Sequence, residues 1–143
     1  MTRLLAPVLL LTLVAACAAA PAGGSTPQVS GAPDRVFPLD FSRSGGFAGR
    51  SDRLHIDADG RMTVTRQGAG SSGPVAVDRT VLDALRQVLA TADPIPSASS
   101  GICADGYRYR ISTPSWSVST DDCAEHHESL DRALELLVPL LRP

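Results

Sequence analysis

Three short stretches of the sequence carry residue types that hold metal ions or phosphates in other proteins. Residues 57–60, "DADG", open like a calcium-binding loop, but position 68, where such a loop supplies its glutamate, is glycine. His126 and His127 are adjacent, and adjacent side chains on a helix point about 100° apart, so they cannot hold one ion together. Residues 44–49, "SGGFAG", lack both the GxGxxG spacing and a following lysine. We therefore expect neither a metal site nor a cofactor site.

No recognisable pattern brings together the residues of a hydrolytic or acid–base active site. No serine stands in a G-x-S-x-G frame, and the carboxylates are spread over expected loops and helix faces without a partner base. His55 falls at an outward position of an expected strand. The sequence thus predicts a protein that is not an enzyme, and a metal ion bound at His126 is the observation that would revive an enzymatic hypothesis.

The N-terminal segment predicts export and lipidation. Arg3 precedes the apolar run "LLAPVLLLTLVAA", which is too short for a comfortable membrane span. The run ends in "VAAC", which resembles the lipobox of bacterial lipoproteins. This resemblance implies that residues 1–16 are a signal peptide and that Cys17 becomes a lipidated first residue, which would anchor an extracytoplasmic protein to a membrane. The alternative is an ordinary signal peptide that is cut nearby and leaves Cys17 as a spare thiol.

Two further cysteines, Cys103 and Cys123, remain as an even pair after export. Outside the cytoplasm such a pair forms a disulfide, and closing a loop of about 20 residues stabilises a fold by about 3 kcal/mol in the chain-entropy model. A structural metal site would require more ligands at closer spacing. We therefore expect a disulfide between Cys103 and Cys123.

The charge of the chain argues against a nucleic-acid partner. All 13 basic residues are arginine, and the chain has no lysine. Once Arg3 is removed with the signal peptide, 12 arginines stand against 15 acidic residues, so the exported chain is acidic. We expect a monomer that binds no nucleic acid and has no other segment able to span a bilayer.

The exported chain divides into a tether and one domain. Residues 17–33 are rich in Ala, Pro, Gly and Ser and show no apolar periodicity, which is typical of a flexible linker. Residues 34–143 are enough for a single domain with one core.

Alternating apolar and polar residues in the domain predict four to five strands. The expected strands cover 35–43, 53–56, 61–66, 107–111 and 115–119. Pro38 suggests an edge position or a bulge in the first strand, and the "DADG" turn joins the second strand to the third. A four-residue loop at 112–115 joins the last two and places Ile111 opposite Trp116.

Two amphipathic helices complete the predicted fold. Asp78 caps a helix over about 79–92, and Asp122 with Glu125 forms a capping pair for a second helix. The expected apolar stripes are Val81, Leu85, Val88 and Leu89 in the first helix and Leu130, Leu134, Leu137 and Leu141 in the second. The predicted fold class is α+β: a two-layer sandwich in which two helices pack on one face of an antiparallel sheet.

The stretch "SGGFAG", lying between two expected strands, resembles the signature of the emfourin family. These small bacterial proteins are named for an inhibitor of protealysin, a thermolysin-like zinc metallopeptidase. The residues that match the signature are Ser44, Gly45, Gly46, Phe47, Ala48 and Gly49. The later strand of Tyr107, Tyr109 and Ile111 and the closing leucine-rich helix also match the family pattern, so the resemblance covers most of residues 36–141. The lipoprotein signal, the tether and the cysteine pair are additions to that pattern.

The resemblance implies a role for the 44–49 corner in binding a peptidase. Thermolysin-like enzymes favour a bulky apolar residue just after the scissile bond, so Gly46 and Phe47 would lie in the cleft as an extended, substrate-like strand. In the alternative, which the small number of aromatic residues favours, the glycines only permit a tight reversal and Phe47 packs into the core.

Two hypotheses for the function follow. The first is a lipid-anchored extracytoplasmic inhibitor, or inhibitor-derived protein, that blocks the cleft of a thermolysin-like metallopeptidase. The second is a non-enzymatic lipoprotein of the cell envelope that binds another protein.

Overall fold

A computed structural model describes residues 34–92 and 103–142 of the chain. The expected signal peptide, the lipidation site at Cys17 and the tether lie outside the described residues. Neither helix in the described residues has the length and hydrophobicity that a membrane-spanning segment requires.

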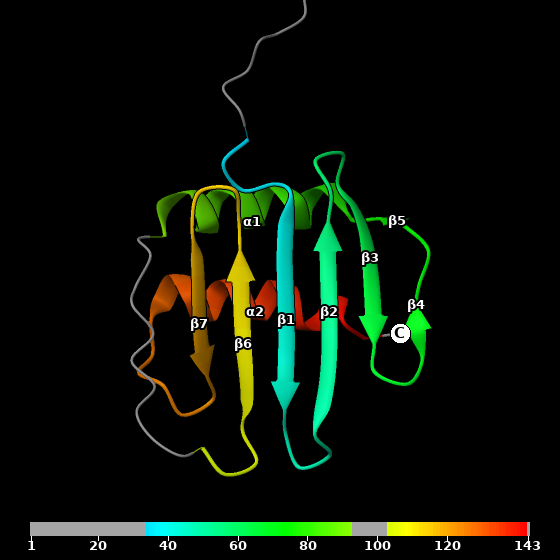
Figure 1. Ribbon diagram of the computed structural model, residues 1–143. Helices are drawn as coiled ribbons and strands as arrows, with labels where there is room; N and C mark the ends of the chain where they lie inside the picture. Colours follow the sequence, from blue (N-terminus) through cyan, green and yellow to red (C-terminus); the bar gives the residue numbers. More distant parts are fainter. Residues whose placement is uncertain (1–33, 93–102, 143) are drawn as a thin grey trace, which may run out of the picture. The chain divides into compact units, whose positions relative to one another are not determined.

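The domain is built on an antiparallel sheet whose central strand is β1 (Figure 1). The strands are β1 (Leu39–Gly45), β2 (Arg50–Ile56), β3 (Arg61–Arg66), β4 (Gly70–Ser71), β5 (Val75–Ala76), β6 (Tyr107–Ser112) and β7 (Ser117–Asp121). They lie in the order β4-β3-β2-β1-β6-β7, and β5 also pairs with β3. The fold is therefore α+β, as the sequence predicts.

The sheet is larger than the predicted four to five strands. The two additional strands, β4 and β5, have two residues each and pair with β3. They lie in and just after the Gly- and Ser-rich segment 67–74, where the sequence predicts no strand. A two-residue strand has no alternation for a periodicity argument to detect, so this segment gave no sign that it would extend the sheet.

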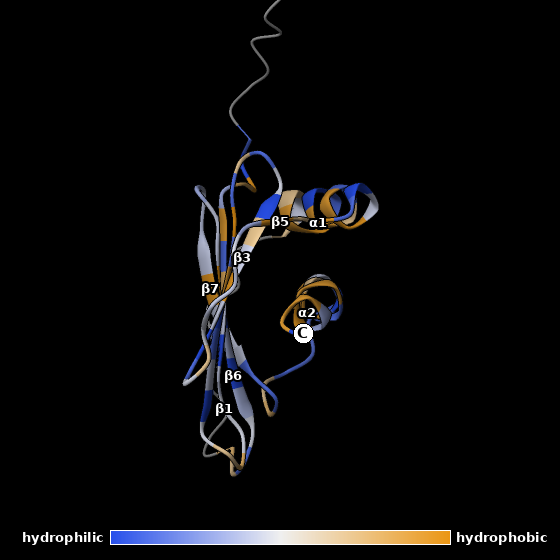
Figure 2. Cartoon of the chain, turned by 90° about the vertical axis from the view of Figure 1, so that its right-hand side faces the viewer, coloured by the Kyte–Doolittle hydropathy of each residue, from blue (hydrophilic) through white to orange (hydrophobic). Residues whose placement is uncertain are grey.

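Both helices lie on the same side of the sheet (Figure 2). They are α1 (Arg79–Thr91) and α2 (Glu128–Leu140). Inward-facing strand residues and the apolar stripes of the helices form one hydrophobic cluster. Its fully buried side chains are Phe41, Leu39, Leu54, Ile56, Leu85, Leu89, Ile111 and Leu137. The stripe of α1 is rotated from the predicted one, because Leu82 is buried while Val81 and Val88 are only partly buried.

The placement of Pro38 differs from the sequence prediction. The alternation predicted a strand from residue 35 that was on an edge or bulged, whereas β1 begins at Leu39 and is paired on both sides. Pro38 therefore precedes the ladder, where its missing N–H costs no inter-strand hydrogen bond.

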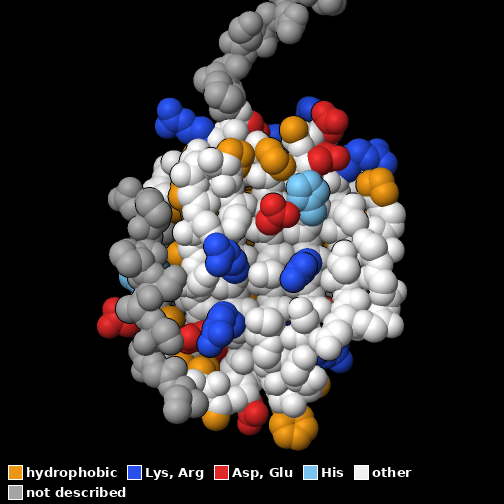
Figure 3. Space-filling model, viewed as in Figure 1, with side chains coloured by type: hydrophobic (Ala, Val, Ile, Leu, Met, Phe, Trp, Pro, Cys, Tyr) orange, Lys and Arg blue, Asp and Glu red, His pale blue; other side chains and the backbone are white. Residues whose placement is uncertain are grey.

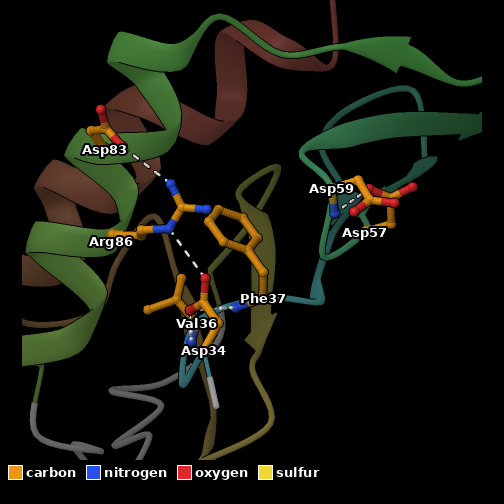
Figure 4. Close-up of polar contacts among 7 residues, drawn as sticks. All are labelled: Asp34, Val36, Phe37, Asp57, Asp59, Asp83 and Arg86. Atoms are coloured by element: carbon orange, nitrogen blue, oxygen red, sulfur yellow. Dashed lines mark hydrogen bonds and ion pairs between the residues drawn. The ribbon is translucent and has the colours of Figure 1, made fainter. Parts of the chain in front are cut away.

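Asp34, at the start of the described domain, ties the chain to α1 (Figure 4). One carboxylate oxygen accepts hydrogen bonds from the backbone N–H groups of Val36 and Phe37, and the other accepts one from Arg86 at 3.1 Å. The Arg86 guanidinium also lies over the Phe37 ring, 4.9 Å from its centroid. These contacts fix the entry of the chain onto the sheet.

One turn and one helix cap agree with the sequence in their chemistry. Asp78 accepts a hydrogen bond from the Thr80 N–H at the start of α1, as its predicted capping role requires. At the "DADG" turn, the Asp57 carboxylate accepts one hydrogen bond from the N–H of Asp59 (Figure 4) and another from the N–H of Arg61. The turn is thus a hairpin connection in which the Asp57 carboxylate binds backbone N–H groups of the turn itself.

The start of α2 was predicted wrongly. The helix begins at Glu128, with His127 at its N-cap and no side-chain capping bond, rather than at the Asp122–Glu125 pair. Asp122 is engaged elsewhere, because its carboxylate accepts a hydrogen bond from the Tyr107 N–H at 2.7 Å. Alanine 133, which was not in the predicted stripe, is buried in α2 beside Leu130 and Leu137.

The β6–β7 loop lies one residue further along than predicted. Ser112 pairs with Ser117 and Ile111 pairs with Val118, so Trp116 is in the loop. The Thr113 hydroxyl accepts hydrogen bonds from the N–H groups of Ser115 and Trp116, and this side-chain turn fixes the loop at 113–116.

Cys103 and Cys123 form a disulfide, as predicted. It joins the segment before β6 to the segment after β7. A Cβ at Gly106 would lie 2.2 Å from the Cys103 sulfur, so only glycine fits beside the bridge.

Replacing Cys103 and Cys123 together with serine is expected to lower the free energy of unfolding by about 3 kcal/mol, because the unfolded chain regains the entropy of the loop. The two cysteines are 20 residues apart in the sequence. Urea unfolding of the variant measures the change, and wild-type protein with a reducing agent is the control that should show the same loss. Equal stability of the oxidised and serine forms would contradict the prediction.

Candidate functional site: an aromatic side chain at the β1–β2 turn

The predicted contact residues, 44–49, form the end of β1 and the turn that leads into β2. Residues 46–49 are the turn itself, and it is closed by a hydrogen bond from the Gly49 N–H to the Gly46 carbonyl at 2.9 Å. Phe47 and Ala48 are its two central residues. The turn therefore reverses the chain tightly instead of running as an extended strand.

Phe47 points away from the domain. It is 93% exposed, whereas the other two phenylalanines, Phe37 and Phe41, are 2% and 1% exposed. The alternative in which Phe47 packs as part of the core is therefore wrong. A side chain at the centre of a turn has no neighbouring strand or helix to cover it. Phe47 is therefore exposed, although the domain has few aromatic residues for its core.

Gly46 lets the turn lie directly on the Tyr107 ring. Its φ is +70°, and a Cβ built on it would lie 2.7 Å from ring atoms of Tyr107. The Gly46 N–H also donates a 3.0 Å hydrogen bond to the carbonyl of Gly106. The first residue of the turn is thus held by the segment that the disulfide restrains.

A row of charged and aromatic side chains lies beneath the turn on the inner face of the sheet. Arg43 pairs with Asp52 at 2.5 Å, and the Asp52 side chain is 7% exposed. The guanidinium lies 4.8 Å from the centroid of the Tyr107 ring. Sequence reasoning missed this pair; the available signal was a charged residue at an inward position on each of two adjacent strands.

Tyr109 extends this row onto β6 and stacks on the core residue Phe41, with ring centroids 6.2 Å apart. Burial, together with a hydrogen bond to the Asp122 carboxylate, raises the pKa of Tyr109 to about 12. Tyr109 therefore stays protonated through the neutral range. At the base of the turn, Tyr109 thus contributes a neutral side chain that stacks on Phe41 and hydrogen-bonds to Asp122.

A polar hollow of about 390 Å³ adjoins the turn. Its lining includes Ala48 and Gly49 of the turn, the arginines Arg50 and Arg66, and Asp52. Arg66 is held in place because its guanidinium donates two hydrogen bonds to the Leu141 carbonyl at the end of α2. The surroundings of Phe47 thus combine one exposed ring with nearby cationic and backbone groups.

The other residues singled out in the sequence lie apart from this turn. His126 is an exposed residue whose Nδ1 lies 3.1 Å from the Asp131 carboxylate, and His55 faces outward beside Asp40. Within the described residues, one group of potential metal ligands lies together: Cys103, Asp121 and Cys123. Because both cysteines are in the disulfide, neither offers a thiolate to an ion.

Comparison of the sequence with models of known protein families gives no match, and comparison with curated proteins gives none either.

Substituting alanine at the two ends of the turn should separate backbone strain from contact with Tyr107. Gly49→Ala is expected to cost about 1 kcal/mol for its positive φ alone, because a Cβ there meets nothing within 4 Å. Gly46→Ala is expected to cost about 2–4 kcal/mol, since overlap with the Tyr107 ring adds to the same strain. Urea unfolding of both variants measures the difference, and equal losses would show that the ring does not support the turn.

The raised pKa of Tyr109 predicts a loss of stability in alkali. An unfolded tyrosine titrates near pH 10 and the folded one near 12, so the folded state holds the proton more tightly. Its contribution is complete below pH 10 and is lost as the pH rises through 12. Urea unfolding across this range should show a steeper fall for wild type than for Tyr109→Phe. Parallel curves for the two proteins would rule out the assignment.

Proposed function

We propose that this protein is a non-enzymatic, lipid-anchored inhibitor, or a descendant of one, that blocks the cleft of a thermolysin-like zinc metallopeptidase. Phe47 would be the anchor that enters the cleft, and Ser44, Gly45, Gly46, Ala48 and Gly49 would form the rest of the contact surface. The two-layer α+β sandwich is the scaffold we infer for this activity, with Cys17 as its membrane attachment. No cofactor takes part in the proposed activity.

The observation that carries the proposal is the exposure of Phe47. Single apolar side chains on a surface are common, but Phe47 is a large ring, 93% exposed, at the centre of a tight turn. Aromatic residues that are exposed in the free protein and buried in a partner pocket supply much of the energy of many interfaces. A peptidase that prefers bulky apolar residues beside the scissile bond offers such a pocket.

The conformation of the turn changes the proposed mode of binding. The sequence suggested an extended, substrate-like strand, but residues 46–49 form a hydrogen-bonded turn. Because an extended peptide adds backbone hydrogen bonds to a cleft and a closed turn does not, we propose that Phe47 enters by its side chain. A turn of this kind also keeps its peptide bonds away from the geometry needed for cleavage.

The supports beneath the turn favour a preformed contact. The Gly46–Gly106 hydrogen bond, the Tyr107 ring and the Arg43–Asp52 pair all act at its base, and none of them involves the Phe47 ring. Holding a binding segment in one conformation lowers the ordering cost of association. The arrangement therefore suits a tip that binds as a rigid unit.

Phe47→Ala is expected to weaken inhibition of a thermolysin-like peptidase by about thirtyfold or more, because loss of a hot-spot aromatic costs about 2 kcal/mol or more. Residues 31–143, which form one compact unit, are the protein to assay. Val75→Ala is the matched control, because Val75 is the other large apolar residue that is exposed among the described residues, at 53%.

Inhibition that survives Phe47→Ala unchanged would place the contact elsewhere on the domain. If wild-type protein at micromolar concentration neither inhibits nor binds the peptidases, the inhibitor hypothesis fails. Recovery of a non-peptidase surface protein by the wild type, but not by Phe47→Ala, would then favour the envelope-binding alternative.

A further inference from the structure

The outer face of the sheet, opposite the helices, carries hydroxyl and arginine side chains. Figure 3 views this face and shows a group of basic side chains over its middle, surrounded mainly by polar surface. The outward positions of the central strands include Asp40, Ser42, Arg53, His55, Arg108 and Arg110. This face takes no part in the site proposed above.

Two of these arginines flank one serine. Ser42 on β1 pairs with Arg53 on β2 and with Arg110 on β6, so the three residues form a row across the sheet. Neighbouring strands lie about 4.8 Å apart, which places the backbones of the two arginines within about 10 Å. Both arginines line a single hollow of about 460 Å³, together with Ser42, Thr63, Thr65 and Ser112.

Neither Arg53 nor Arg110 forms an ion pair with a described residue. In the ranges 34–92 and 103–142, the ion-paired arginines are Arg43, Arg86 and Arg132, and their partners lie away from this hollow. The one acidic residue of the hollow, Asp40, is hydrogen-bonded to His55 at 2.8 Å. Two unpaired cations thus share a hollow on a domain that has 12 arginines and 15 acidic residues overall.

We propose that this hollow, the Arg53–Arg110 site, binds a phosphate group of a polyanionic chain. Guanidinium groups make paired hydrogen bonds to phosphate oxygens, and serine and threonine hydroxyls supply further donors around a tetrahedral anion. Arg108 is two residues from Arg110 on the same face of β6, where it lies opposite Asp121 of β7, and it adds a third guanidinium to this face. A polymer is required because a shallow, solvent-exposed site gains little from one charge pair.

The same face fits other polyanionic partners less well. No aromatic or aliphatic side chain lies among its central outward positions, so nucleic-acid bases would find no stacking surface and a bilayer no inserting group. A polycarboxylate also fits less well than a phosphate chain. Each carboxylate offers only two coplanar oxygens, which leaves more of the hydroxyl donors in the hollow without acceptors.

The proposal is tested by calorimetry, which measures the binding of inorganic polyphosphate to residues 31–143 at several salt concentrations. We expect binding that weakens as salt rises, and a loss of about tenfold at low salt for Arg53→Gln or Arg110→Gln. The salt slope should also fall by about one for each arginine removed. Arg79→Gln is the matched control, because Arg79 is an exposed arginine at the start of α1. Circular dichroism checks that the variants fold.

Several outcomes would overturn the proposal. These are no polyphosphate binding at low salt, equal weakening by Arg79→Gln, or binding of orthophosphate, polyglutamate or oligothymidine as tight as that of polyphosphate. Binding to vesicles of anionic lipid without binding to polyphosphate would assign the site to a membrane surface instead. Because no peptidase is present in the assay, its result is independent of the proposed inhibition.

Discussion

The burial of one carboxylate, Asp52, organises the end of the sheet that carries the exposed aromatic turn. A buried aspartate must be paired, and removal of its partner from such a pair costs about 3–5 kcal/mol. The partner is Arg43 on the adjacent strand. The arginine has a buried Nε without a hydrogen-bond acceptor among the described residues, and contact of the guanidinium with the Tyr107 ring offsets part of that cost. The ion pair and the ring together fix the position of β1, β2 and β6 just below the turn.

The alternation of the strands separates the two surfaces for which functions are proposed. Inward positions on β1 change along the strand from Leu39 and Phe41, which lie in the core, to Arg43 beneath the turn. Outward positions of the same strands carry hydroxyls and arginines, among them Ser42, Arg53 and Arg110. A substitution on the outer face therefore leaves the core and the base of the turn untouched, and the two proposed sites can be altered one at a time.

Sequence periodicity and residue chemistry predicted the main strands, both helices, the disulfide and the Asp78 cap, because each leaves a local pattern. Local patterns were not enough for the two-residue strands β4 and β5 or for the loop that the Thr113 hydroxyl fixes. They also failed where a side chain bonds to a distant part of the chain. Asp122 was assigned to a helix cap, but its carboxylate binds the Tyr107 N–H, 15 residues away in sequence. The "SGGFAG" corner was identified, yet its sequence could not distinguish an outward Phe47 from a buried one. The Arg53–Arg110 site was missed because its two arginines are brought together only by strand pairing.

The restraints on the β1–β2 turn act on its base and leave its tip free of contacts with the core. The disulfide holds the segment from Cys103 toward β6, the Gly106 carbonyl in that segment binds the Gly46 N–H, and the Tyr107 ring supports Gly46 from below. A turn that served only to connect two strands would need the reversal but not a phenylalanine at its centre, where small and polar residues are preferred. Leaving the Phe47 ring in water costs free energy, and no contact with the described part of the domain offsets that cost. A partner that buries the ring would supply one, and the restraints beneath the turn would then limit the conformational entropy lost on binding.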